Sequence, residues 1–209
     1  MTPDLLVDND VLIKLAAYGL LNQLSSFGSV GILGSARYVV SARLKKVCPA
    51  GLDDFASFLE TVIEVEPTDA EIAITAALSE FGQMHGLPLD VGESQLVAIT
   101  IERGTGVVIT GDKRAIVSMP KAIASQYDAQ PLNGRIVCLE QLILGMGGQK
   151  IRAHICSQPG MDKALRLCFG CYRADFNLDD VEVGLHSYVT AIRNECGELL
   201  YSADAFSPV

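Results

Sequence analysis

The stretch that decides the fold is Leu5-Leu6-Val7-Asp8-Asn9-Asp10-Val11-Leu12-Ile13, near the start of the chain. It opens with a short apolar run, typical of a buried strand, which ends at Asp8. Asp10 is expected to cap a following helix, because apolar residues recur at helical spacing from Leu12 as far as Leu24. This stretch therefore predicts a strand and then a helix, with acidic side chains at the junction.

The same order of strand and helix recurs along the chain. Further strands are expected at residues 30–33, 63–66, 106–110 and 135–138. Helices are expected at residues 35–47, 52–62, 68–84 and 90–102, and from residue 113. Strands that alternate with helices are typical of a parallel sheet covered by helices on both faces, so the predicted fold class is α/β.

The clearest boundary signal lies at residues 145–149, which include three glycines. We therefore expect a domain at residues 1–146 and a mainly helical C-terminal extension, packed on that domain, at residues 147–209. Within the extension, helices are expected at residues 161–172 and 178–196. A hairpin around residues 194–197 is the alternative for the end of the second helix.

Composition narrows the class of protein. The chain has 209 residues, of which 49% are apolar, enough for a buried core. Acidic residues stand near the N-terminus, where a secretory signal needs a basic start. No apolar run approaches the roughly 20 residues of a membrane span. We expect a cytoplasmic protein with no membrane association.

The cysteines and the charge balance exclude other classes. The six cysteines are irregularly spaced and are expected to be buried thiols: Cys48, Cys138, Cys156, Cys168, Cys171 and Cys196. Cys168 and Cys171 form a lone C-x-x-C, short of the four ligands of a structural zinc site. The net charge of −9 argues against a high-affinity DNA-binding module. It is compatible with an enzyme that binds phosphate groups through a divalent metal ion.

Acidic side chains follow two of the predicted strands. Asp8 follows the first strand, and Asp112 follows the strand at residues 106–110. Ligands bind beyond the carboxyl ends of parallel strands, so these carboxylates are expected to meet, with Glu93 one turn inside a nearby helix. Oxygen ligands of this kind suit Mg²⁺ or Mn²⁺. These acids also have a purely structural interpretation as helix caps. Asp112 would cap the helix that follows it, and Asp90 would form a capping box with Glu93.

Three segments resemble the motifs of PIN domains, in the family's order: residues 6–13, residues 89–94 (the LDxGE variant) and residues 108–114. The resemblance covers about residues 4–145. It implies a three-layer α/β/α sandwich and hydrolysis of RNA phosphodiester bonds with Mg²⁺ or Mn²⁺. It also implies that Asp8, Glu93 and Asp112 are the catalytic and metal-binding acids. Many family members are toxins of toxin–antitoxin pairs, so candidate partners are RNA, an antitoxin-type protein and a second copy of the chain.

The sequence departs from the family's pattern at one place. PIN domains usually carry another acid early in the second helix, but residues 39–44 contain no carboxylate and include Arg43. A degenerate PIN fold that acts as a binding or assembly module is therefore one alternative. The basic residues of helix 35–47, which are Arg37, Arg43, Lys45 and Lys46, have two interpretations: they steer RNA, or they form a solvated helix face.

A second alternative is a phosphatase of the haloacid-dehalogenase type. Asp8 and Asp10 resemble its D-x-D nucleophile motif, and Asp112 resembles its late acidic motif. That family needs a lysine between the two motifs, yet residues 47–112 contain none. It also needs a second acid four residues after Asp112, where apolar residues stand.

Overall fold

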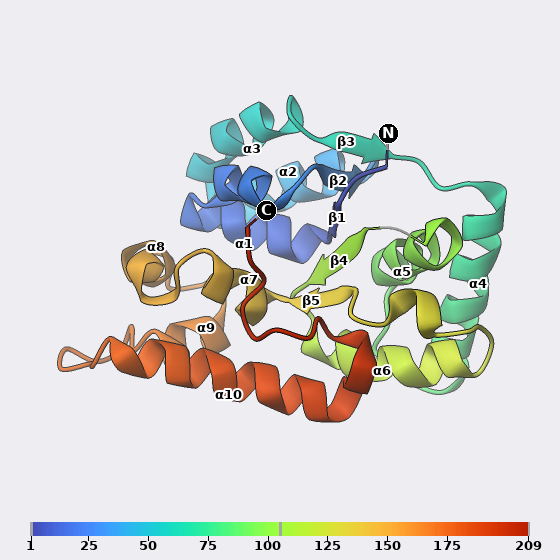
Figure 1. Ribbon diagram of the computed structural model, residues 1–209. Coiled ribbons are helices and arrows are strands. Elements are labelled where there is room, and N and C mark those ends of the chain that lie inside the picture. Colours follow the sequence, from blue (N-terminus) through green and yellow to red (C-terminus); the bar gives the residue numbers. More distant parts are fainter. Residues whose placement is uncertain (1, 105, 209) are drawn as a thin grey trace.

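A sheet of five parallel strands lies at the centre of the molecule (Figure 1). The computed structural model describes residues 2–104 and 106–208. The strands are β1 (Leu5–Val7), β2 (Val30–Leu33), β3 (Ile63–Val65), β4 (Val107–Thr110) and β5 (Ile136–Cys138). Their order across the sheet is β3-β2-β1-β4-β5, which places β1 between β2 and β4. The predicted α/β class with a parallel sheet is confirmed.

Helices connect the strands and continue after the last one. The α-helices are α1 (Asn9–Tyr18), α2 (Ala36–Val47), α3 (Leu52–Leu59), α4 (Asp69–Met84), α5 (Val91–Arg103), α6 (Lys113–Ala124), α7 (Leu139–Gly145), α8 (Arg152–Cys156), α9 (Lys163–Cys168) and α10 (Asp179–Cys196). Short 3-10 helices are η1 (Leu21–Phe27), η2 (Pro49–Gly51), η3 (Gln130–Leu132), η4 (Gly148–Ile151) and η5 (Gly197–Leu199). No helix in these described parts combines the length and the apolar composition that a membrane span requires.

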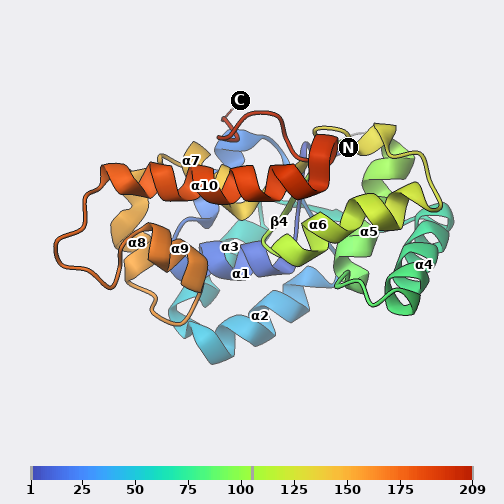
Figure 2. The same cartoon turned by 90° about the horizontal axis from the view of Figure 1, so that it is seen from below.

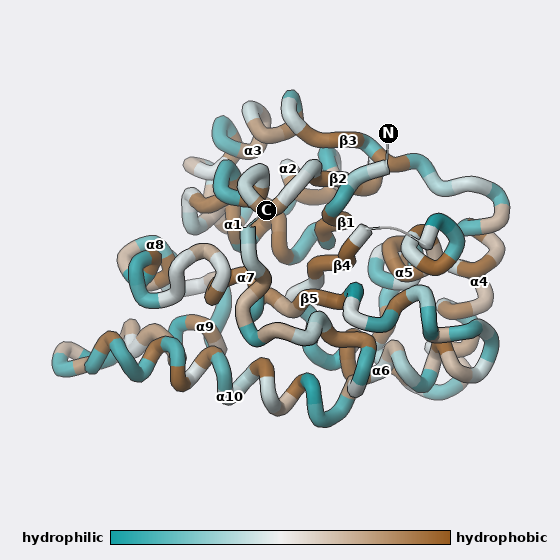
Figure 3. Tube along the Cα trace, viewed as in Figure 1, coloured by the Kyte–Doolittle hydropathy of each residue, from teal (hydrophilic) through white to brown (hydrophobic). Residues whose placement is uncertain are grey.

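The sheet separates two hydrophobic cores, because side chains alternate between the faces of a strand. Leu5 and Val7 point into the core beneath α1, α2 and α3, whereas Leu6 points into the core beneath α4, α5 and α6. Val108 and Ile109 of β4 divide in the same way. In Figure 3, β4 and β5 are brown, the colour of hydrophobic residues, at the centre of the molecule. The result is the expected three-layer α/β/α sandwich.

The C-terminal extension closes one side of the sandwich. Helix α10 packs against α6 and α7, and Figure 2 shows it as a long helix beside both of them. Val181 and Leu185, in its first half, join the core under α1, and Val189 and Ile192 join the other core. The hairpin alternative is wrong, because α10 continues to Cys196.

Backbone pairing continues after α10. Leu200 forms a parallel bridge with Ile136 of β5, and Tyr201 N donates to Ile136 O at 2.7 Å. The side-chain amide of Gln141 then donates to Tyr201 O at 2.9 Å and to Ala203 O at 2.7 Å. The segment after α10 is thereby fixed to the sheet edge.

The structure corrects three expectations about local elements. Helix α1 ends at Tyr18 rather than near Leu24, because Gly19 adopts a left-handed conformation (φ 67°) and a 3-10 helix follows. The helix expected at residues 161–172 is shorter, since α9 ends at Cys168 and Gly170 is also left-handed (φ 56°). Asp10 does not cap α1: Asp8 does, because the helix begins directly after it.

The cysteine prediction is wrong for two of the six residues. Cys156 of α8 and Cys171, after α9, form a disulfide with a Cα–Cα distance of 5.2 Å. The fold brings them together although fifteen positions separate them. Cys48, Cys138, Cys168 and Cys196 are buried free thiols, as expected.

Candidate functional site

An acidic hollow of ≈ 400 Å³ opens at the carboxyl edge of the sheet, where β1 and β4 end. It is lined by Asp8, Asp10, Lys14, Asp90, Glu93, Gly111 and Asp112. The three acids singled out in the sequence thus border one space. The walls come from α1, from the N-terminus of α5 and from the turn between β4 and α6.

Asp8 and Asp112 occupy equivalent positions on neighbouring strands. β1 and β4 pair in parallel, with Val7 opposite Ile109, and each strand leads into a helix that its acid caps. Asp8 Oδ2 accepts a hydrogen bond from Asp10 N at 3.2 Å. Asp112 Oδ1 accepts hydrogen bonds from the backbone N atoms of Arg114 (2.9 Å) and Ala115 (3.3 Å). Both carboxylates are oriented by local backbone, and Asp112 has the cap role expected of it.

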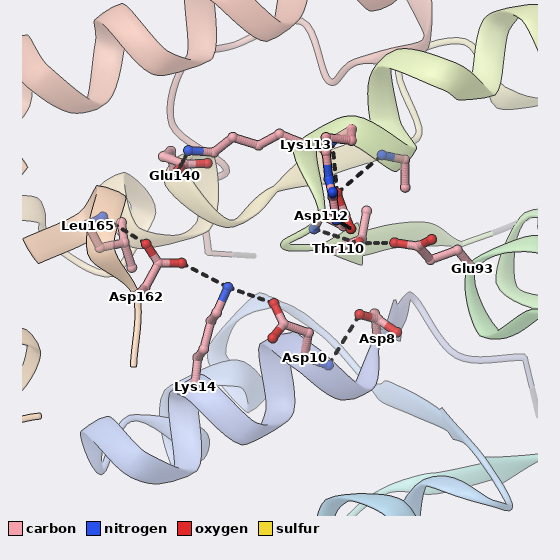
Figure 4. A network of polar contacts seen from close by, with 12 residues as sticks. Asp8, Asp10, Lys14, Glu93, Thr110, Asp112, Lys113, Glu140, Asp162 and Leu165 are labelled. Carbon is pink, nitrogen blue, oxygen red and sulfur yellow. Dashed lines mark hydrogen bonds and ion pairs between the residues drawn. The ribbon is translucent and has the colours of Figure 1, made fainter. Parts of the chain in front are cut away.

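Glu93 enters the hollow from the first turn of α5. It forms the predicted capping box with Asp90: Glu93 N donates to Asp90 Oδ1 at 2.8 Å, and Asp90 N donates to Glu93 Oε2 at 3.1 Å. The hydroxyl of Thr110 donates to Glu93 Oε1 at 3.4 Å and accepts from Asp112 N at 3.2 Å (Figure 4). Thr110 therefore links Glu93 to the turn that carries Asp112.

Burial and mutual repulsion shift the acids of this site. Burial, with the nearby Asp90 and Asp10 charges, raises the pKa of Asp8 to about 6. Burial and the charges of Asp90, Asp8 and Asp112 raise the pKa of Glu93 to about 8. Burial also acts on Asp112, but hydrogen bonds from Arg114 and the α6 backbone outweigh it and hold its pKa below the ordinary value. Asp8 and Glu93 thus lack charge compensation that Asp112 has.

Lys14, which was not predicted from the sequence as a site residue, lies in the same hollow. Lys14 Nζ is 2.6 Å from Asp10 Oδ2 and 2.8 Å from Asp162 Oδ2, and the lysine side chain is only 11% exposed (Figure 4). Burial lowers the pKa of Lys14, but the two carboxylates outweigh it, so its pKa lies above the ordinary value. Lys14 stands four residues after Asp10, the spacing of a helical ion pair, so the sequence carried a signal for it.

A second lysine ties the site to the last helices. Lys113 Nζ is 2.6 Å from Glu140 Oε1 of α7 and lies 3.8 Å from the ring centroid of Tyr188 in α10. The Glu140 side chain is almost fully buried. No motif marks Glu140 or Asp162 in the sequence, because their partners lie far away along the chain.

The neighbouring surface of α2 carries no carboxylate, as the sequence indicated. A second hollow of ≈ 390 Å³ adjoins the first and shares Asp8, Asp10 and Asp90 with it. Val39 of α2 lines this hollow, together with Ser35, the residue before α2. α2 and the residue before it therefore contribute an aliphatic side chain and a hydroxyl to this hollow, and no carboxylate.

The donor set suits a hard divalent cation, although the side chains are not closed around one point. Within residues 2–104 and 106–208, no three His, Cys, Asp or Glu side chains are arranged to hold a metal ion as they stand. Neither Asp8 nor Glu93 forms an ion pair with a described residue. A divalent cation would compensate these two carboxylates, so the chemistry of the donors fits Mg²⁺ or Mn²⁺ after side-chain rotation.

The chain matches no protein-family model, no curated protein and no solved structure. The resemblance to PIN domains therefore rests on the three motifs at residues 6–13, 89–94 and 108–114. Those motifs supply Asp8, Glu93 and Asp112, which border the acidic hollow described above.

Proposed function

We propose that this chain is a metal-dependent endoribonuclease of PIN type, which hydrolyses phosphodiester bonds of RNA. The observation that carries the proposal is the placement of Asp8 and Asp112 at the ends of adjacent parallel strands, with Glu93 linked through Thr110 to the turn that carries Asp112. Carboxylates converging at this edge of a parallel sheet are the arrangement expected for a divalent-metal site.

In the proposed enzyme, Asp8, Glu93 and Asp112 hold Mg²⁺ or Mn²⁺. When bound, a divalent cation offsets negative charge on a phosphodiester and activates water for attack. The protein's part is to keep the three acids oriented, which the helix caps and the Thr110 hydrogen bonds do. Because the pKa of Glu93 is raised to about 8, binding a cation near neutral pH would displace its proton, and below about pH 6 it would also displace the proton of Asp8.

The wider setting belongs to the same proposal. The resemblance to PIN domains supports a toxin-like role in the cytoplasm, with an antitoxin-type protein as partner and a homodimer as the assembly. Each of these is testable by copurification and by the mass of the purified protein in solution.

A specific observation favours a second candidate, a non-catalytic PIN-like module. Lys14 places an ammonium in the acidic hollow, where it pairs with Asp10 and Asp162. In addition, α2 contributes Val39 rather than an acid. A basic group inside the site and a missing ligand are what a degenerate site would have. Lys14 does not pair with Asp8 or Glu93, however, so the core of the proposed metal site keeps its unbalanced charge.

The deciding experiment is cleavage of a mixed RNA pool by the purified chain, with Mn²⁺, with Mg²⁺ and with chelator. We expect slow cleavage that is faster with Mn²⁺, since Mn²⁺ binds a given ligand set more tightly. Asp8→Ala, Glu93→Ala and Asp112→Ala should each remove nearly all of it, because the carboxylates act as one unit. Asp54→Ala, at an exposed position on α3, is the matched control and should cleave as the parent does.

Two outcomes would favour the alternatives. If neither metal supports cleavage and Asp8→Ala changes nothing measurable, the non-catalytic module replaces this proposal. If Asp10→Ala abolishes activity while Glu93→Ala does not, and a phosphomonoester is hydrolysed, the phosphatase reading replaces it.

A further inference from the structure

We propose that the outer face of α2 is a binding surface for single-stranded nucleic acid, over which a strand continues after it leaves the acidic hollow. The inference rests on the proposed function, because it assigns the path of that enzyme's substrate. Three observations support it. Most of α2 is exposed, a stripe of exposed side chains leads along α2 from the hollow that contains Asp8, and Arg43, Lys45 and Lys46 form no ion pair with a described residue.

Helix α2 packs against the rest of the protein through a narrow buried face. Only Ala36, Val40 and Leu44 are buried among its twelve residues. Large side chains stand on the opposite, solvent-facing side: Tyr38 is 73% exposed and Val39 is 48% exposed. The ring of Tyr38 and the side chain of Val39 are therefore free to contact a ligand that lies along this face.

A continuous stripe leads along α2 away from the site. Val39, Ala42, Arg43 and Lys46 are all exposed and lie at positions i, i+3, i+4 and i+7, so they share one face. Val39 lines the ≈ 390 Å³ hollow that contains Asp8. Lys46 lies about 10 Å further along the helix axis, from a rise of about 1.5 Å per residue.

The stripe ends at a third hollow, which has a basic lining. This hollow of ≈ 530 Å³ lies between α2 and Leu59 of α3, and Tyr38, Lys45 and Lys46 contribute to its wall. The stripe thus connects a site proposed to act on a phosphodiester with a recess that offers an aromatic ring and two ammonium groups. A single-stranded nucleic acid can lie along the stripe on α2, with its phosphates next to the lysines and a base stacked on the ring of Tyr38.

Three cations along this face lack an ion-pair partner, whereas Arg37, in the wall of the third hollow, pairs with Glu64. No described residue forms an ion pair with Arg43, Lys45 or Lys46, and α2 contains no acidic residue. Lysines in the last turn also stabilise a helix through its dipole, which would by itself account for Lys45 and Lys46. The dipole gives no reason for Arg43 in the preceding turn, or for the exposed Tyr38.

The chemistry of the face selects its ligand. Phosphates of a nucleic acid would pair with the cations, and unstacked bases would stack on Tyr38, which requires a single strand. An acidic protein segment would satisfy the cations but would leave the ring without a stacking partner. We therefore assign the face to a single-stranded nucleic acid.

The experiment measures binding of a short fluorescent oligouridylate by anisotropy, in chelator, so that no cleavage occurs. Lys45→Ala/Lys46→Ala should weaken binding roughly tenfold and reduce the slope of log K against log salt by about 1.4, since each of the two phosphate contacts on a single strand contributes roughly 0.7. The matched control is Lys121→Ala/Lys150→Ala, which removes the same charge from exposed lysines without ion pairs elsewhere. The control should bind as the parent does.

Tyr38 gives a second, charge-neutral test. Tyr38→Ala should weaken binding at least fivefold, and Tyr38→Phe should restore it, because stacking needs the ring alone. Equal loss in both lysine double variants, or an unchanged Tyr38→Ala, would overturn the assignment. So would polyglutamate competing as well as the unlabelled oligonucleotide. Since binding is measured without metal, a parent that cleaves without using α2 refutes this inference alone. A parent that binds through α2 but never cleaves refutes only the proposed function.

Discussion

Lys14 Nζ lies 2.8 Å from Asp162 Oδ2, so a residue of the C-terminal extension contacts a side chain of the acidic hollow. Asp162 also caps α9, where its Oδ1 accepts a hydrogen bond from Leu165 N at 2.9 Å. The two oxygens of one carboxylate thus join α1 to the start of α9. The extension therefore contacts a residue in the wall of the candidate site, and changes at Asp162 should be felt there.

Asp162→Ala should destabilise the protein by about 2 kcal/mol, because it removes one of the two carboxylates that pair with the Lys14 ammonium and also removes the cap of α9. Lys14→Met should also destabilise it. The double variant should cost less than the sum of the two, since neither change then strands a charge. Urea unfolding of the four proteins measures the coupling, and additive losses would show that the Lys14–Asp162 contact is not formed.

Glu93→Gln should raise the stability of the metal-free protein at high pH. The pKa of Glu93 is raised from 4.5 to about 8, so the folded state holds a proton that the unfolded state has released between these values. Stability in chelator should therefore fall as pH rises from about 4.5 to about 8, and Asp8, raised from 3.8 to about 6, adds to the lower part of that decline. Melting temperatures across this range should fall less steeply in Glu93→Gln than in the parent.

The exposed Glu80→Gln on α4 is the matched control for this pH series and should follow the parent. If Glu93→Gln and Glu80→Gln gave the same curve, the Glu93 carboxyl would not be the group that repels its neighbours. Added Mn²⁺ should also flatten the parent's decline, because a cation stabilises the ionised form.

Asp112→Asn should remove the response to metal without unfolding the chain. Asparagine caps a helix about as well as aspartate does, so α6 keeps its start. In the parent, Mn²⁺ should raise the melting temperature in proportion to the logarithm of its concentration well above the dissociation constant. Thermal scans over a Mn²⁺ series test this, and an equal rise in parent and variant would exclude Asp112 as a ligand.

Gly111→Ala should disturb the Asp10–Lys14 pair. A Cβ at Gly111 would lie 2.7 Å from Asp10 Oδ2 and 3.2 Å from Lys14 Nζ, so both side chains would have to move. We expect a loss of about 1 kcal/mol, the low end for added volume in a packed site, because these are ends of flexible side chains. Gly160→Ala, where nothing lies within 4 Å, is the control. Chemical unfolding of both variants gives the comparison.

The sequence was most informative where structure is decided locally. Asp8 and Asp112 could be placed because each ends a short apolar run, and the capping box of Asp90 and Glu93 could be read because its residues are three apart. The start of α1 was placed too late, since Asp8 and Asp10 are both good caps and propensity does not choose between them.

Contacts between segments that are distant along the chain could not be predicted from the sequence, for a physical reason. The partners of Lys14 and Cys156 are fixed only when α8 and α9 pack beside α1, and no local period records that packing. The proposed metal site and RNA path are accordingly statements about tertiary structure, and the variants above test them directly.

The pairing of Leu200 with Ile136 has a consequence for the order in which this chain can fold. Until residues 179–206 have been synthesised, the outer edge of β5 is unpaired and the apolar faces of α6 and α7 that α10 covers are open to water. Unpaired strand edges with apolar surroundings are prone to association. A nascent chain stalled before α10 should therefore be a substrate for chaperones, although most of its sheet has already been made.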